Sequence, residues 1–236
     1  MMMKRLLTIT VLLALSWTAC SAEKTIADRV AQFGAAADKR LMPYFASAGV
    51  SYPPSQVTLI GLKEERQVQL YAAGTNGQYH FIRSYPILAA SGNSGPKLRE
   101  GDAQVPEGFY CIESLNPNSR FHLSLRINYP NAFDRAQAKA EGRTNLGGDI
   151  MIHGNAVSIG CLAMGDIAAE DLFVLADRTR LRNIHVILSP VDFREGKTVE
   201  LSKHAPLWLG RLYKSMKAEL TRYGTGRISD SWTGFF

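Results

Sequence analysis

The stretch "MIHGNAVSIGC", residues 151–161, is the one around which the rest of the chain can be interpreted, because it places a histidine and a cysteine in one turn-forming segment. A cysteine becomes a nucleophile when a nearby imidazole or backbone N–H groups stabilise its thiolate. A strand that ends at His153 and returns through a turn to Cys161 would supply both groups and would depress the pKa of the thiol. Gly160 can adopt backbone angles that other residues avoid, so the amides of Gly160 and Cys161 could face a developing oxyanion. From spacing alone, a buried histidine beside an inert cysteine fits equally well.

Two structural roles compete with that interpretation. A structural zinc site needs about four closely spaced cysteine and histidine ligands, and the histidines at positions 80, 122, 153, 185 and 204 form no such pairs. We therefore expect neither a metal nor another cofactor. A disulfide between Cys111 and Cys161 is the second alternative, because paired cysteines in an oxidising compartment are usually bonded. The strand-like context of Cys111 in "GFYCIESL" differs from the glycine-flanked turn at Cys161, and both alternatives for the cysteines stay open.

Residues 1–22 have the pattern of a secretory signal peptide. Lys4 and Arg5 precede an apolar stretch at 6–17, which is too short to span a bilayer, and small residues follow it. We expect soluble export, with lipid attachment at Cys20 as the alternative that would bring the protein to a membrane. Removing the leader lowers the net charge from +6 to about +4. In an exported protein this basic character favours anionic polymers such as cell wall over nucleic acid, and a merely solvated surface explains it equally well.

Hydrophobic periodicity divides the rest of the chain into helices and short strands. Apolar residues at helical spacing predict a helix over 26–41, which Pro43 should end. Runs rich in branched and aromatic residues predict strands at 57–63, 67–74, 79–88, 109–115, 121–129, 147–154 and 184–190. Further helices are expected at 133–142, 166–182 and 205–223, with Asp166 as the N-cap of the second. A Gly/Pro-rich loop at 89–108 is too long to be a casual connection. No linker or repeat divides the chain, so we predict one α+β domain with a β-rich centre.

The strand at 121–129 has an unusually regular alternation. Phe121, Leu123, Leu125, Ile127 and Tyr129 point to one face, and His122, Ser124, Arg126 and Asn128 point to the other. A polar strand face is usually exposed to solvent, and it can also line a groove for a polar substrate.

Several separated motifs occur in the order found in one known family. They are "SGNSGPKLREGDAQVPEG", "VPEGFYCI", "LNPNSRFHLSLRINYPNAFDRA", "GGDIMIHG" and "IHG…SIGC" followed by Met164. Together they resemble the catalytic domain of the L,D-transpeptidases, cysteine enzymes that remodel bacterial peptidoglycan. Within that family they are similar to the subgroup that includes the hydrolase detaching the outer-membrane (Braun) lipoprotein from peptidoglycan. The resemblance covers residues 55–190, which leaves an N-terminal helix at 23–54 and a C-terminal helical extension at 191–236.

The resemblance implies a role for each motif residue. Cys161 would be the nucleophile that attacks the carbonyl at the L-centre of diaminopimelate and forms a thioester, and His153 would be its base. Gly160 and the Cys161 amide would form the oxyanion hole, while Ser158 and Gly154 would support the turn. The implied fold is a β-rich, sandwich-like domain with the cysteine at the mouth of a groove.

The chain departs from the family pattern at positions that face the substrate. Ile159 stands where a second histidine is common, Ala163 stands where an arginine is common, and the segment between His153 and Cys161 is short. The empty arginine position makes Arg126 the first candidate for binding a substrate carboxylate, followed by Asn128, Lys97 and Tyr129.

These departures remove groups that would hold and shield a second peptide. We therefore predict a periplasmic hydrolase that acts on peptidoglycan stem peptides and cleaves the amide between diaminopimelate and the lysine of an outer-membrane lipoprotein. A transpeptidase that forms cross-links or attaches lipoprotein is one alternative. A peptidoglycan-binding module without catalysis is another, and nucleic acid is not an expected partner.

Overall fold

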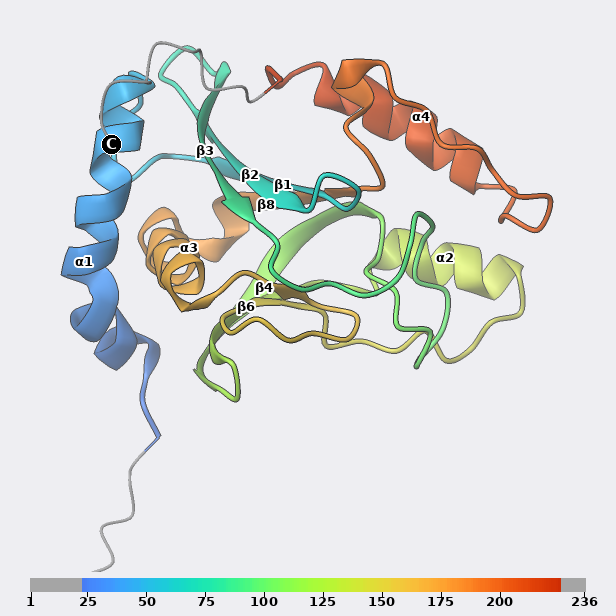
Figure 1. Ribbon diagram of the computed structural model, residues 1–236, viewed down its shortest axis with the longest axis horizontal. Coiled ribbons are helices and arrows are strands. Elements are labelled where there is room, and N and C mark those ends of the chain that lie inside the picture. The colour runs from blue at the N-terminus through green and yellow to red at the C-terminus, as the bar shows by residue number, and fades with distance from the viewer. Residues whose placement is uncertain (1–22, 226–236) are drawn as a thin grey trace, which may run out of the picture.

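The computed structural model describes residues 23–225 of the chain. The expected signal peptide, including Cys20, therefore lies outside the described residues. Figure 1 shows a central sheet with helices on both sides. The strands of that sheet lie in the order β3-β2-β1-β8-β4-β5-β6-β7. The prediction of an α+β domain with a β-rich centre is confirmed.

Helix α1, Ile26–Ser47, begins at Thr25, whose side chain accepts from the Asp28 amide in a capping box. The prediction that Pro43 ends this helix is wrong, because the helix continues for one more turn through Pro43. Phe45 extends the buried stripe that Ala37 and Leu41 begin. Burying a phenylalanine contributes about 1.5–3 kcal/mol, which helps to offset the cost of proline inside a helix.

The first half of the sheet is an antiparallel meander of β1, β2 and β3 that is joined to a later strand. These strands are β1 Val57–Leu62, β2 Gln67–Ala73 and β3 Tyr79–Pro86. Strand β8, Ile184–Ser189, lies parallel to β1 on its other edge. Strand β1 is buried along its whole length, as expected for a strand with packed layers on both faces.

A single long strand, β4 Gly108–Ser119, links the two halves of the sheet. Its first residues pair with β8, and its later residues pair with β5, His122–Ile127. Beyond β5 lie β6, Met151–His153, and the short parallel strand β7, Leu162–Ala163. The candidate histidine and cysteine therefore belong to the far edge of the sheet.

Helices α1 and α3 pack on one face of the central sheet, and helix α4 packs on the other. Helix α3, Asp166–Thr179, lies beside α1 and shares one apolar cluster with Leu59 of β1. Helix α4, Leu209–Leu220, packs through Leu212 and Met216 on the other face, against Ile60 of β1. Helix α2 spans Ala132–Ala140, and 3₁₀ turns occur at Leu181–Asn183 and Phe193–Glu195. Between residues 23 and 225, no helix is long and apolar enough to cross a bilayer.

The start of α3 differs from the prediction. Gly165, not Asp166, is the N-cap residue, and no side chain caps this helix. Asp166 is instead the first helical residue, and its Oδ1 accepts from the Asn155 amide at 2.7 Å. Asp166 thus ties the segment that follows His153 to the helix that follows Cys161.

Candidate active site

His153 ends β6, and Cys161 directly precedes β7, the strand that pairs with β6 in parallel. In the register of the sheet, Arg126 is opposite Met151, Ser124 is opposite His153, and His153 is opposite Ala163. Cys161 directly precedes β7, and its Sγ accepts from the Met151 amide at 3.4 Å. Because residues two apart on a strand share a face, the Arg126–Met151 pair and the Ser124–His153 pair form one surface. The predicted polar face of the strand at 121–129 belongs to this surface.

The imidazole of His153 is held in one tautomer. Its Nδ1 lies 2.6 Å from the Gly154 carbonyl oxygen, and since a carbonyl can only accept, Nδ1 carries the hydrogen. The lone pair of Nε2 is therefore the basic one. Burial lowers the pKa of His153, partly opposed by the bond to Gly154. The ring is thus a neutral base at neutral pH, although no hydrogen bond joins it to Cys161 among the described residues.

Phe121 has a role that the sequence did not predict. Its ring stacks on the ring of His153, with centroids 4.7 Å apart. The predicted alternation fails here because His122 has a φ of +71°, which reverses the direction of the side chains at the start of β5. His122 consequently contacts Phe33 and Glu170 on the far side. Phe121 shields the candidate base from water, which helps to keep its pKa low.

The thiol of Cys161 is partly buried and protonated. Burial raises its pKa, and Asp149 adds to the rise, while the Met151 amide bond and Lys97 lower it. The Sγ also lies 3.5 Å from the Asp149 carbonyl oxygen, to which the thiol donates. The expectation that this pKa is depressed is wrong, because the neutral imidazole contributes no positive charge and burial dominates. At rest the Cys161 thiol is therefore protonated and the His153 imidazole is neutral.

A thiol of this kind should react slowly with a neutral alkylating agent. We expect iodoacetamide labelling of Cys161 at pH 7 to be slow, and its rate to rise steadily up to and beyond pH 9, because only the thiolate reacts and the pKa lies above its usual 9.0. Mass spectrometry of Cys161 and Cys111 across pH 6–10 measures this, with Cys111 as an internal reference. A rate that is already at its plateau at pH 7 would show a stabilised thiolate and contradict the structure.

Both candidate oxyanion amides have serine partners. The Gly160 amide donates to Ser91 Oγ at 2.7 Å, and the Cys161 amide donates to Ser158 Oγ at 3.1 Å. Ser91 lies in the loop at 89–107 and was not predicted as a site residue; its only signal was the glycine-rich context of that loop. Gly160 has a φ of +82°, which favours glycine there. At Gly154 a Cβ would come within 2.7 Å of backbone, so only glycine fits.

The four candidate substrate-binding residues fall into different places. Arg126 lies on the site face and pairs with Glu113 at 3.0 Å and Asp149 at 2.7 Å. Asn128 extends the β4–β5 pairing, since its Oδ1 accepts from the Cys111 amide. Lys97 is buried in an ion pair with Asp102 at 2.8 Å. Tyr129 is buried, and its hydroxyl donates to the carbonyls of Lys97 and Leu146. Arg126 is thus the candidate with a partly exposed cationic side chain on the site face.

The disulfide alternative can be tested directly in the structure. Cys111 and Cys161 are both free thiols, so the disulfide alternative is wrong. No cluster of metal-ligating side chains occurs within residues 23–225.

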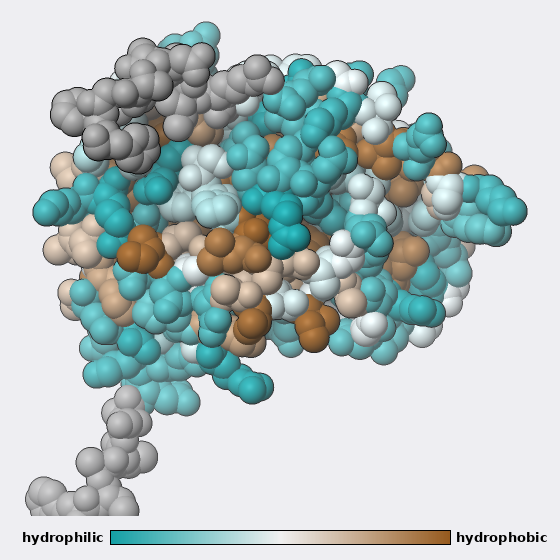
Figure 2. All heavy atoms as spheres, in the orientation of Figure 1, coloured by the Kyte–Doolittle hydropathy of each residue, from teal (hydrophilic) through white to brown (hydrophobic). Residues whose placement is uncertain are grey.

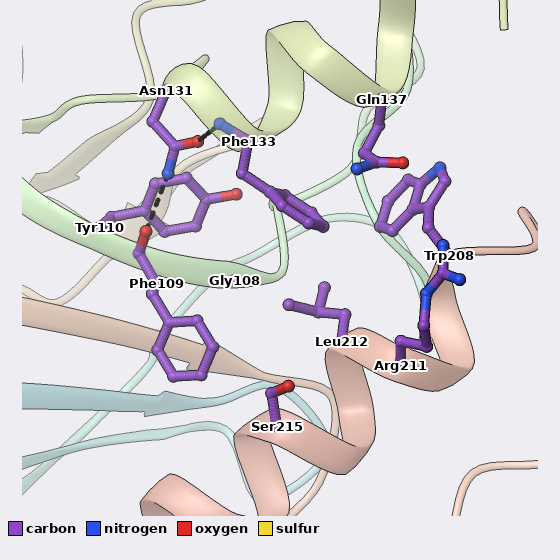
Figure 3. Close-up of a pocket in the computed structure, with 10 residues that line it drawn as sticks. All are labelled: Gly108, Phe109, Tyr110, Asn131, Phe133, Gln137, Trp208, Arg211, Leu212 and Ser215. Atoms are coloured by element: carbon purple, nitrogen blue, oxygen red, sulfur yellow. Dashed lines mark hydrogen bonds between the residues drawn. The ribbon is translucent and has the colours of Figure 1, made fainter. Parts of the chain in front are cut away.

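The described part of the chain contains several cavities. One of about 440 Å³ is lined by Ser91 and Leu162, next to the turn that carries Cys161. Another of about 270 Å³, drawn in Figure 3, lies between β4, α2 and α4 around Phe133 and Trp208. On the face shown in Figure 2, apolar side chains are scattered among polar ones. The turn that carries Cys161 therefore has a cavity at its side.

Comparison with known proteins gives matches over part of the chain. Over 113 residues the chain is 43% identical to "Putative L,D-transpeptidase YafK" of Escherichia coli K12, covering 47% of this chain and 43% of that protein. The protein of the same name from Escherichia coli O157:H7 gives the same values. The match thus spans less than half the length of these curated relatives. No family model matches the chain.

Solved structures give weaker likenesses. The helical cell shape determining protein Pgp2 from Campylobacter jejuni is 22% identical with a TM-score of 0.46, covering 63% of this chain and 50% of that one. L,D-transpeptidase 1 from Mycobacterium tuberculosis is 13% identical with a TM-score of 0.34, covering 57% of this chain and 62% of that one. The sequence resemblance to the L,D-transpeptidases is confirmed by the curated relatives: nearly half of this chain is homologous to proteins that carry that family's name.

Proposed function

We propose that this protein is an exported cysteine enzyme that acts on peptidoglycan stem peptides and hydrolyses an amide at the L-centre of diaminopimelate. The single observation that carries the proposal is that Cys161 Sγ accepts from the Met151 amide of β6, the strand that ends at His153, whose imidazole is held as a neutral base. The homology to proteins named L,D-transpeptidase supports the substrate class. We take residues 55–190 as the catalytic unit, with 1–22 as a signal peptide and with 23–54 and 191–236 as flanking parts.

The proposed reaction starts from the neutral pair. As Sγ of Cys161 bonds to the substrate carbonyl carbon, the thiol proton passes to Nε2 of His153. The carbonyl oxygen becomes an oxyanion, and collapse of the tetrahedral intermediate breaks the C–N bond. The leaving amine takes the proton from His153, and a thioester remains. Water then attacks the thioester with His153 as base again, which releases a carboxylic acid and restores the thiol.

The Cys161 amide is the principal oxyanion donor in this proposal. Its acceptor, the Ser158 hydroxyl, lies at 3.1 Å and is neutral, and a charged acceptor forms a bond roughly twice as strong. The oxyanion therefore displaces Ser158. The Gly160 amide forms the shorter hydrogen bond, to Ser91 Oγ. We therefore propose that this amide fixes the orientation of the turn before Cys161 and does not bind the oxyanion. Gly154 lets the chain pass close to Phe121 after the base.

Hydrolysis is favoured over transpeptidation by what surrounds Cys161. Ile159 is 83% exposed, and Ala163 is completely buried opposite His153. Neither position offers a polar group that could orient an incoming amine. A transpeptidase must hold a second peptide and exclude water, whereas a hydrolase needs only to admit water. The most suitable leaving group is the lysine amine of a cross-linked outer-membrane lipoprotein.

The test is to incubate the purified protein with a lipoprotein-linked muropeptide, with and without excess amine acceptor, and to identify the products by mass. Release of the lipoprotein peptide and a free tripeptide carboxylate under both conditions is the expected result. A dominant amine-exchanged or diaminopimelate-linked product would assign transpeptidation instead. Tight binding without any product would assign a binding module.

Arg126 is proposed to bind a carboxylate of the stem peptide. A charge-assisted bond of this kind contributes about 1.5–3 kcal/mol, so we expect Arg126→Ala to raise KM roughly tenfold or more with little change in kcat. Steady-state kinetics on the muropeptide measures the effect. Arg182→Ala is the matched control, because Arg182 is exposed on the 3₁₀ turn Leu181–Asn183, away from the site face. An unchanged kcat/KM for Arg126→Ala would remove this residue from the site.

A further inference from the structure

The loop at 89–107 contacts the cysteine turn through Ser91. Ser91 Oγ accepts from the Gly160 amide and donates to the Ala103 carbonyl, both at 2.7 Å. One hydroxyl therefore connects the start of the loop, its returning limb and the residue before Cys161. The loop contains no helix and no strand. Its start is held by the bridge between Ala89 and Ala163, and the position of its returning limb, to which Ser91 donates, depends on contacts elsewhere.

A buried ionic network holds this loop. Glu107, 1% exposed, accepts from Lys63 Nζ at 2.9 Å and from the Gly95 amide at 2.8 Å through the same oxygen, Oε1. Lys63 Nζ also donates to the carbonyls of Gly95 and Val105. All three donors of the ammonium group thus end on the loop. Burial lowers the pKa of Lys63, and the carboxylate of Glu107 opposes that change.

The network ends on the C-terminal helix. The Tyr213 hydroxyl of α4 donates to the second oxygen of Glu107, Oε2, at 2.6 Å. Tyr213 itself is buried in the cluster that packs α4 against the sheet. Without this hydroxyl, Oε2 would be a buried carboxylate oxygen with no donor, and buried polar groups without partners are strongly disfavoured. Glu107 would then have to move, and Gly95 would move with it.

We propose that Tyr213, Glu107 and Lys63 are positioning residues for Cys161, which act through the loop at 89–107 and the Ser91–Gly160 hydrogen bond. Helix α4 thereby becomes part of the machinery that aims the Cys161 amide and thiol, although it contributes no group to the reaction. The effect on peptide turnover rests on the function proposed above; the effect on the Gly160 amide does not.

The central experiment compares two tyrosine-to-phenylalanine variants of the full chain. Tyr213→Phe removes the donor to Glu107. Tyr223→Phe is the matched control, because its hydroxyl lies 3.2 Å from Thr58 Oγ1 in the same buried cluster but touches no part of the network. We expect Tyr213→Phe to lower kcat about tenfold with KM within about twofold, and to speed hydrogen exchange of the Gly160 amide about tenfold. Tyr223→Phe should change neither.

A second variant tests whether the effect passes through Ser91. Ser91→Ala should reproduce the loss in kcat and the faster exchange, and adding Tyr213→Phe should lower kcat no further, since residues in one network are not additive. The proposal is overturned if Tyr213→Phe changes neither kcat nor the exchange rate of the Gly160 amide, or if Tyr223→Phe changes them as much as Tyr213→Phe does. It is also overturned if the losses in kcat of Ser91→Ala and Tyr213→Phe multiply in the double variant. Should Tyr213→Phe fail to fold, unchanged Gly160 exchange in Ser91→Ala would overturn it equally.

The two proposals can fail separately. If the unmodified protein releases no product from muropeptides, the proposed function fails. Exchange of the Gly160 amide in the same variants still decides whether α4 positions the cysteine turn.

Discussion

Cys161→Ala is expected to abolish release of product from lipoprotein-linked muropeptides, with a loss on the order of 10⁴-fold or more, and to leave the fold intact. The thiol supplies the bond-forming sulfur, and its two hydrogen bonds, at 3.4 and 3.5 Å, contribute little stability because sulfur is a weak donor and a weak acceptor. The measurement is product mass over time together with thermal unfolding of the same sample.

Cys111→Ala is the matched control for this variant. Cys111 lies on β4 opposite His185 and is a free thiol like Cys161. Its activity should stay within about twofold of the unmodified protein. Equal loss in both variants, or measurable turnover by Cys161→Ala with normal folding, would contradict the assignment of the nucleophile.

His153→Ala is expected to lower kcat by ~10²–10⁴-fold, the range that general-base catalysis usually contributes. His185→Ala serves as the control, because His185 is an exposed histidine on β8. If His153→Ala kept more than about a tenth of the activity, the loss would fall below that range and the base assignment would be wrong.

The pH profile gives an independent check on the same residue. Because burial lowers the pKa of His153 below its usual 6.5, the free enzyme keeps its base neutral at pH 7, and kcat/KM should fall only at pH values below 6.5. The unfolded chain binds a proton at higher pH than the folded one, so stability should also decrease as the pH falls below 6.5. Phe121→Ala would expose the ring and move the acid limb of kcat/KM upward toward 6.5. An acid limb above 6.5 in the unmodified protein would contradict this account.

Local sequence patterns predicted most of the secondary structure. Alternation predicted β5, and the buried row of Leu123, Leu125 and Ile127 confirms it. The predictions from local sequence patterns were wrong where a contact with a distant part of the chain outweighed the local conformational preference. Pro43 stays inside α1 because Phe45 packs into the core, and the alternation of β5 breaks at His122 because a positive φ turns Phe121 onto His153.

The sequence by itself determined which residues we propose to carry the chemistry. A histidine and a cysteine around glycines, in the order of the L,D-transpeptidase motifs, identified the candidate nucleophile and base without any structure. Those motifs are local, so spacing along the chain is enough to find them.

Only the tertiary structure decided the state of these groups. The neutral state of His153 depends on its burial against Phe121, and the protonated thiol of Cys161 depends on burial and on Asp149. The link from Tyr213 to Ser91 joins residues more than a hundred positions apart through the buried carboxylate of Glu107. Desolvation and long-range hydrogen bonds depend on which surfaces meet in the folded chain. A local sequence pattern cannot predict these tertiary contacts.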